Sequence, residues 1–213
     1  MRQEALDAML SFLSETERLK SVLRTAWTAD GRRESTAEHS WHLALWAMVF
    51  LEEFPALDGR RVLELCLLHD LGELYGGDVS AALRPDANAK QQQERRDVLR
   101  AVSLLPAKNS ERFAALWEEY EAGETPEAQL VRALDKAETI LQHSQGKNPP
   151  DFDYGFNLGY GAALFEKDRT LRQLRALLDE RTRARIDGAD ETEEPPVGAH
   201  GHPLENEPDA SKG

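Results

Sequence analysis

A histidine and an aspartate stand side by side after an apolar run, and together they could bind a metal ion. His69-Asp70 follows Cys66-Leu67-Leu68, and neighbouring residues of an α-helix point about 100° apart. Both side chains can therefore reach one ion only near a helix end, where the core opens into a pocket. An imidazole nitrogen together with a carboxylate oxygen suits Mn, Fe, Co, Ni or Zn better than calcium. Taken alone, the dipeptide also fits a hydrogen-bonded structural pair.

Two more residues of the ligand type lie on other predicted helices. His39 follows a capping box in which Ser35 is the N-cap and Glu38 stands three residues later. Asp135 lies within Ala-Leu-Asp-Lys-Ala (133–137), on the flank of its predicted helix rather than on the apolar stripe. Periodicity alone therefore leaves Asp135 as a solvated acid.

The order His, His-Asp, Asp, with each member on a predicted helix, resembles the HD-domain superfamily of metal-dependent phosphohydrolases. The local sequence is more similar to one branch, the 5′-deoxynucleotidases that act on nucleoside monophosphates. The matching stretches are Arg-Thr-Ala-Trp (24–27), Ser-Thr-Ala-Glu-His-Ser (35–40), His-Asp-Leu-Gly-Glu-Leu-Tyr-Gly-Gly-Asp (69–78) and Ala-Leu-Asp-Lys-Ala-Glu (133–138). Together they span the region from about residue 15 to residue 145.

The resemblance implies a set of site residues and a reaction. One divalent ion (Mn, Co, Ni, Fe, Zn or Mg) would be bound by His39, His69, Asp70 and Asp135. Glu73 would orient or deprotonate the attacking water, and Asp78 would lie near the ribose or the leaving oxygen. Arg24 would bind the phosphate, with Trp27 as a second substrate-binding residue. The expected activity removes the 5′-phosphate from (deoxy)nucleoside monophosphates.

Several alternatives remain open for these residues. Glu73 also fits a surface acid at a helix end, and Asp78 also fits the N-cap of the next segment. The aromatic residue that follows the phosphate-binding arginine in some bacterial members excludes a 2′-hydroxyl, but here Thr25 follows Arg24. The sequence therefore leaves the sugar and base preference undecided.

The other histidines bear on how many metal ions are bound. No histidine occurs between His69 and His143, an interval in which two-metal HD enzymes carry further histidines, so we expect one ion. Glu73 is followed by Leu74 rather than by Asp, which argues against the ppGpp hydrolase branch. We expect His42 to pack near the site and His143 to be structural. His200 and His202 lie in a polar tail, where a metal-binding role is not expected.

The elements that would position these residues are predicted to be helices throughout. Apolar residues recur at helical spacing near residues 6–13, 41–50, 61–71, 113–120 and 171–178. Residues 87–105 predict a long polar helix, and Thr125-Pro126 predicts the start of a helix that ends near residue 145. Residues 24–36 are predicted as a polar loop with a turn at Asp30-Gly31. The predicted fold class is all-α, and the resemblance implies an HD-domain helical bundle.

The 213 residues fit one domain with an appendage. We expect a phosphohydrolase domain over residues 1–186 and a disordered acidic tail over 187–213, which holds eight acidic residues and one lysine. The net charge of −13 argues against a nucleic-acid polymer as partner. No apolar stretch approaches a membrane span, and the N-terminus does not fit a signal peptide, so we expect a cytoplasmic protein.

A homodimer is expected for two reasons. The helix over 41–50 is apolar nearly all round, and Trp117 and Tyr120 form a later apolar stripe. Relatives of the branch that the chain resembles also form dimers. Two rival functions stay open: an HD phosphohydrolase for another phosphoester, or a non-catalytic helical module that binds a nucleotide.

Overall fold

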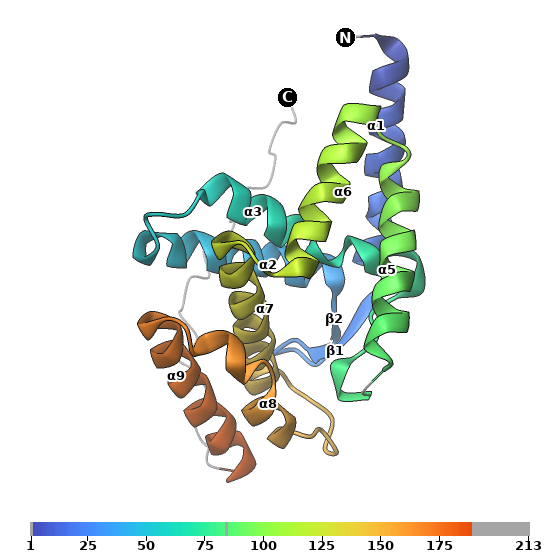
Figure 1. The fold of residues 1–213 in the computed structure, drawn as a ribbon. Coiled ribbons are helices and arrows are strands. Elements are labelled where there is room, and N and C mark those ends of the chain that lie inside the picture. Colours follow the sequence, from blue (N-terminus) through green and yellow to red (C-terminus); the bar gives the residue numbers. More distant parts are fainter. Residues whose placement is uncertain (1, 84, 189–213) are drawn as a thin grey trace, which may run out of the picture.

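The computed structural model describes residues 2–83 and 85–188, which form a helical bundle with one small β-hairpin (Figure 1). This confirms the all-α fold class. Residues 189–213, with His200, His202 and most of the predicted tail, lie outside the described residues. The elements are α1 (Gln3–Thr16), η1 (Glu17–Lys20), β1 (Leu23–Trp27), β2 (Arg33–Ser35), α2 (Thr36–Phe50), η2 (Leu51–Glu53), α3 (Gly59–Leu68), η3 (His69–Gly72), α4 (Glu73–Gly76), η4 (Ala81–Leu83), α5 (Ala87–Val102), α6 (Ala107–Ala122), α7 (Pro126–Gln145), α8 (Gly155–Gly159), η5 (Ala162–Phe165) and α9 (Arg169–Ile186).

The β-hairpin lies where the sequence predicted a polar loop. β1 pairs with β2 in antiparallel register, with Leu23 opposite Ser35 and Trp27 opposite Arg33. The turn at Gly31 was predicted correctly, and its φ of +92° suits a residue without a Cβ atom. The loop prediction was wrong because the hairpin's buried face carries a charged pair, Arg24 and Glu34, and not the apolar residues that alternation detects.

The helix α2 begins and ends close to its predicted limits, and the capping box at its start is confirmed. Such an N-cap stabilises a helix by about 0.5–2 kcal/mol. Although α2 is apolar nearly all round, only one of its faces is buried, through residues that include Leu43 and Ala47. Trp41 and Val49 stay 64% and 68% exposed. Within a single chain, α2 therefore keeps an exposed apolar face.

The chain changes its helical geometry at the His-Asp pair. A helix was predicted over 61–71, but α3 stops at Leu68 and a 3₁₀ turn, η3, carries His69 and Asp70. The tighter winding has 3.0 residues per turn rather than 3.6. A Cβ atom on Gly72, at the end of this turn, would lie 2.6 Å from the Cβ atom of Glu94, so η3 packs directly on α5.

Two apolar cores meet at this change of geometry. One core joins α2, α3, α7 and α9 through residues such as Leu43, Leu65 and Leu134. The other joins α1, α5 and α6 through residues such as Phe12, Val98 and Trp117, and these three helices lie together in Figure 1. Leu68, the last residue of α3, packs against both cores. The His-Asp pair that follows it therefore emerges between two packed layers.

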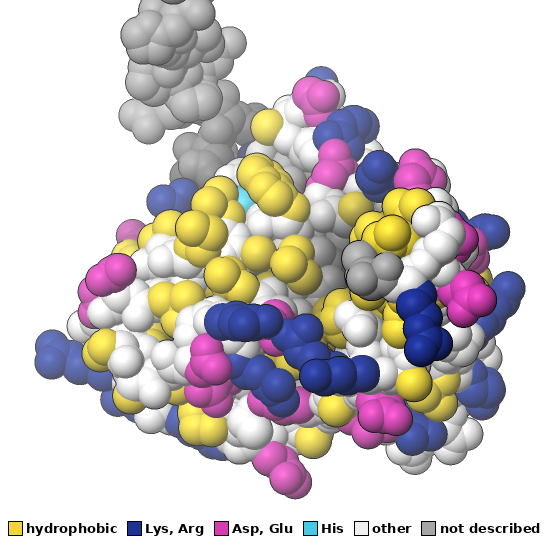
Figure 2. Space-filling view, turned by 90° about the horizontal axis from the view of Figure 1, so that it is seen from above, with side chains coloured by type: hydrophobic (Ala, Val, Ile, Leu, Met, Phe, Trp, Pro, Cys, Tyr) yellow, Lys and Arg dark blue, Asp and Glu magenta, His cyan; other side chains and the backbone are white. Residues whose placement is uncertain are grey.

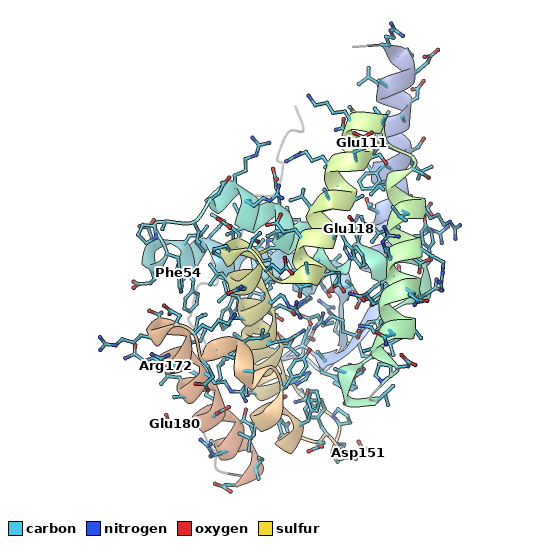
Figure 3. The ribbon with its side chains drawn as sticks, in the orientation of Figure 1. Phe54, Glu111, Glu118, Asp151, Arg172 and Glu180 are labelled. Atoms are coloured by element: carbon cyan, nitrogen blue, oxygen red, sulfur yellow. The ribbon has the colours of Figure 1, made fainter. Side chains whose placement is uncertain are left out.

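The helix α7 runs through the middle of the bundle, with its N-cap Thr125 and Pro126 as predicted. The segment between α7 and α9 includes the short helix α8. The connection between α7 and α8 projects from the bundle at Asp151 (Figure 3). Cys66 is buried in the core. None of the helices that the structure describes combines the length and apolar character that crossing a membrane requires.

Candidate active site

A cavity of about 460 Å³ opens between α5, α6, α7 and the hairpin, where side chains from these elements converge (Figure 3). Six of the eight residues singled out from the sequence line it: Arg24, His69, Asp70, Glu73, Asp78 and Asp135. His39 is fully buried behind them. Trp27 does not line this cavity, because its ring packs edge-on against Phe152 at 5.9 Å between centroids.

His69 is held in place by groups on both sides of it. Its Nδ1 atom lies 2.9 Å from the carbonyl oxygen of Cys66, one turn earlier. The indole Nε1–H of Trp117 donates to the carbonyl oxygen of His69 at 3.1 Å. Because a carbonyl oxygen accepts only, Nδ1 carries the proton and Nε2 keeps its lone pair. That Nε2 lies 3.0 Å from Oδ2 of Asp70.

His39 faces the same point from the first turns of α2. Its Nε2 atom lies 3.2 Å from Oδ1 of Asp135 and 3.8 Å from Oδ2 of Asp70. Its Nδ1 atom lies 2.6 Å from Oε2 of Glu138. His39, His69 and Asp70 each offer a ligand atom within 4.8 Å of the others.

These donors fit a metal ion. The Nε2 atoms of His39 and His69 are buried and have no hydrogen-bond partner, a costly state for polar atoms unless something else binds them. Imidazole nitrogens and carboxylate oxygens together form a donor set suited to a divalent transition metal. His39, His69 and Asp70 could therefore hold a divalent ion, and Asp135 is joined to them through its contact with His39.

Both carboxylates of the cluster are ionised. Burial raises the pKa of Asp70, but His69, His39 and Arg24 outweigh burial and hold the pKa below its usual range. Burial also raises the pKa of Asp135, and the neighbouring Lys136 and the two histidines bring it well below its usual value. Metal ligation requires deprotonated carboxylates, so both residues are ready to bind a cation.

Glu73 lies one turn beyond Asp70, buried in the cavity wall. The hydroxyl of Thr36 donates to its Oε2 atom at 2.9 Å. Burial, followed by the charges of Asp70 and Asp78, raises the pKa of Glu73 well above its usual value. A carboxylate whose pKa lies above its usual value takes up a proton more readily, which suits it to acid–base chemistry.

Arg24 is fixed by three contacts from three elements. Its Nη1 lies 3.3 Å from Oδ2 of Asp70, and its Nη2 donates to Oγ1 of Thr139 at 3.0 Å. Its Nε lies 3.4 Å from Oε2 of Glu34 across the hairpin. A guanidinium has five N–H groups, so two remain available to a ligand in the cavity.

A smaller cavity of about 50 Å³ adjoins the first and shares Arg24, Asp78 and Tyr160 with it. It is lined in addition by Thr25, which takes the place of the aromatic residue, and by His143. The Nδ1 atom of His143 lies 2.8 Å from Oδ1 of Asn157. His143 is thus buried and hydrogen-bonded, in agreement with a structural role.

Sequence reasoning missed three residues that touch the ligands. The hydroxyl of Tyr120 and the ammonium of Lys136 donate to Oδ2 of Asp135 at 2.7 and 2.8 Å. Glu138 bridges His39 and His42, which lie 2.6 and 2.8 Å from its two oxygens. Burial raises the pKa of Glu138, but His39 and His42 hold it at about 2. Its position three residues after Asp135 was the available signal, because residues so spaced share a helix face.

The stripe of Trp117 and Tyr120, read from the sequence as surplus apolar surface, is buried inside the chain. Trp117 contacts the backbone of His69 and Tyr120 contacts Asp135. These two residues therefore give no support to the expected homodimer.

The chain is similar to a known protein family and to several known proteins. Residues 16–175 match the family model described as "HD domain". The human protein named 5′-deoxynucleotidase HDDC2 is 34% identical over 140 residues, which cover 65% of this chain and 68% of that protein. The 5′-deoxynucleotidase hdd1 of Schizosaccharomyces pombe is 30% identical over 145 residues, covering 63% of this chain and 70% of its own.

A similar solved structure is described as a predicted metal-dependent phosphohydrolase from Magnetospirillum magnetotacticum MS-1. It superposes with a TM-score of 0.73 at 32% identity and covers 85% of this chain and 97% of its own.

Proposed function

The chain belongs to the HD domain family, and from this premise we propose that it removes the 5′-phosphate from (deoxy)nucleoside monophosphates. The observation that carries the proposal is the pair of orphaned imidazole nitrogens on His39 and His69. They face two ionised carboxylates at a cavity that also presents Arg24 and Glu73. The names of the relatives, 5′-deoxynucleotidases, support a nucleotide as substrate.

We assign the metal ligands to His39, His69, Asp70 and Asp135, and we infer one ion per chain. A divalent cation held there would supply charge neutralisation for the phosphate and acidity for the attacking water. The two carboxylate ligands cancel the formal charge of such a cation. A substrate dianion therefore needs a further positive group.

Arg24 is that group in our proposal. Its two free N–H groups can bind two phosphate oxygens, and the contacts with Glu34 and Thr139 keep the guanidinium plane in a fixed orientation. Since the phosphate charge is present before and during the reaction, Arg24 contributes mainly to binding.

Glu73 orients the attacking water and takes its proton. The hydroxyl of Thr36 holds one carboxylate oxygen, which leaves the other for water. Asp78 follows Gly77, whose φ of +78° turns the chain back toward the cavity. We place Asp78 at the ribose or the leaving oxygen. Trp27 as a substrate-binding residue remains a prediction from the sequence.

A phosphate-release screen tests the proposed function. Nucleoside mono-, di- and triphosphates are incubated with protein reconstituted with Mn, Co, Ni or Mg, and dAMP is compared with AMP for the sugar preference. We expect phosphate release from monophosphates, and its loss in Asp70→Asn. If no nucleotide releases phosphate with any metal, the binding-module alternative replaces the enzyme. Release only from another phosphoester would favour the alternative of an HD phosphohydrolase with a different substrate.

Metal analysis of protein purified without chelator tests the inferred number of ions. We expect about one transition-metal equivalent per chain, since the ligand cluster holds donors for one ion. Two equivalents at full occupancy would contradict a single site.

We also infer that residues 1–186 form the catalytic domain, since α9 ends at Ile186. Removing residues 188–213 should then leave metal content and activity unchanged.

We infer that a second copy of the chain covers the exposed face of α2. Trp41, Leu45, Met48 and Val49 are exposed there, and hydrophobic side chains also gather on the face that Figure 2 shows. Contiguous exposed apolar patches of this kind mark interaction sites. Sedimentation should give a dimer at micromolar concentration and a monomer for Met48→Glu. A monomeric wild-type protein would contradict the inference.

A cytoplasmic location remains a prediction from the sequence.

A further inference from the structure

Glu138 is a fully buried carboxylate that contacts two histidines from one helix. Its Oε2 atom lies 2.6 Å from Nδ1 of His39, and its Oε1 atom lies 2.8 Å from Nδ1 of His42. The side chain of Glu138 has no exposed surface. An ionised carboxylate only accepts hydrogen bonds, so both imidazole rings donate from Nδ1.

This contact decides which nitrogen of His39 is available to a metal. With its proton on Nδ1, the neutral ring keeps the lone pair on Nε2. That atom is 3.2 Å from Oδ1 of Asp135 and has no hydrogen-bond partner of its own. The other tautomer would direct a proton at the ion and a lone pair at an anionic oxygen. Glu138 therefore selects the metal-binding form of the ring.

His42 explains why Glu138 stays in place. It lies one turn after His39 on α2, with a side chain that is 26% exposed at the edge of the groove beside Leu45 and Trp46. Its Nδ1–H satisfies the second oxygen of Glu138, which would otherwise be a buried anionic oxygen without this partner. Two contacts on opposite oxygens fix both the position and the plane of the carboxylate.

We propose that Glu138 is a positioning residue for the metal ligand His39, and that His42 anchors it from the opposite side. The proposal rests on the metal site of the proposed function. It differs from a reading in which Glu34, His39 and Glu138 hold an ion of their own, although these three also offer atoms within 4.8 Å of one another. A hydrogen bond of 2.6 Å already occupies the nitrogen that such an ion would need.

Metal affinity of the apo protein tests the proposal, measured by competition with a chelator for Co²⁺ and Mn²⁺ and without any nucleotide. Glu138→Gln replaces one acceptor by an NH₂ group, so it can no longer accept from both rings. We expect a loss of about 10–100-fold in affinity, the usual effect of removing a partner that orients a ligating histidine. The visible absorption spectrum of the Co²⁺ protein should also shift. His42→Phe should reduce the affinity in the same direction by a smaller factor.

Asp97→Asn is the matched control, because Asp97 is also a buried acid but contacts Gln93 on α5. Its metal affinity should stay within about twofold of wild type. If Glu138→Gln lowers the melting temperature but binds metal as tightly as this control, Glu138 is only a packing residue and the proposal is wrong. Should Glu138→Gln not fold, Glu138→Asp keeps the charge but shortens the side chain by one methylene. The same loss of affinity is expected, and wild-type affinity would overturn the proposal.

The metal titration separates a failure of the proposed metal site from a failure of the proposed role of Glu138. If wild-type protein binds neither metal, the proposed metal site itself is wrong. If wild-type protein binds metal and Glu138→Gln binds it equally well, only the role of Glu138 falls.

Discussion

The hydroxyl of Tyr120 donates a 2.7 Å hydrogen bond to Oδ2 of Asp135, and its ring lies 5.1 Å from that of His69 between centroids. Trp117, one turn earlier on α6, donates to the carbonyl oxygen of His69. Neither residue is among the proposed ligands, yet together they touch two of them. The helix α6 thus supports the metal site from behind.

Tyr120→Phe should weaken metal binding by about tenfold, at the low end for a group that orients a ligand. The substitution removes one of the two donors on Oδ2 of Asp135 and leaves Lys136 alone to hold it. Chelator competition measures the effect. Tyr75→Phe serves as control, because its ring packs under Arg100 outside the cavity. Equal metal affinity in both variants would show that the Tyr120 hydroxyl does not position Asp135.

Glu73→Gln should lower kcat by about 10²–10⁴-fold, the range of general acid–base catalysis. The amide keeps the volume and can still accept from Thr36, but it cannot take a proton from water. Metal content should be preserved. Glu118→Gln should leave kcat unchanged, because Glu118 is half-exposed, pairs with Arg95 of α5 and does not line the cavity. Near-normal turnover in Glu73→Gln would identify Glu73 as a structural acid.

Arg24→Lys should raise KM by about 10–100-fold with a smaller change in kcat, since charged hydrogen bonds contribute about 1.5–3 kcal/mol. A lysine keeps the charge but cannot contact Glu34, Asp70 and a phosphate at once. Steady-state kinetics separates the two parameters, with the exposed Arg60→Lys as control. A lowered kcat at unchanged KM would mean that Arg24 acts in the chemical step.

His143 should contribute to the pH dependence of stability. Burial lowers its pKa, and the bond to Asn157 opposes this only in part. The folded state therefore binds a proton less readily than the unfolded chain. The neutral ring of His143 therefore contributes to the free energy of unfolding above about pH 6.5, the pKa of histidine in an unfolded chain. This contribution is lost as the pH falls below that value.

Urea unfolding at a series of pH values tests this prediction. The free energy of unfolding should fall less between about pH 7.5 and pH 5 in His143→Gln than in wild type, because the glutamine does not titrate. Parallel pH profiles for the two proteins would contradict it.

Helix positions followed from the sequence because caps and apolar spacing act locally. The start of α2 at its capping box and the start of α7 at Thr125-Pro126 were both predicted. The hairpin was missed because its inward side chains, Arg24 and Glu34, neutralise each other and do not pack as apolar residues. A pattern search for alternating hydrophobicity cannot register a buried ion pair.

Some of the site residues could also be identified from the sequence, and others could not. His69 and Asp70 could be noticed from an apolar run that ends in two polar residues. Tyr120 could not, because the same spacing places a tyrosine on any apolar stripe, and only the packing of α6 against α7 brings its hydroxyl to Asp135. The full exposure of one face of α2 was also unforeseeable, since apolar composition does not say whether the cover comes from the same chain.

The contacts of the site join segments that lie far apart in the sequence. Arg24 meets Thr139 across 115 positions, and His39 meets Glu138 across 99. Closing such long loops costs entropy before any contact stabilises them, so we expect these contacts to form late in folding. Of the four proposed ligands, Asp135 lies on α7, so the ligand set is complete only after α7 has left the ribosome. We expect metal binding to be the final step of maturation. The bound ion would then stabilise only the completely folded chain.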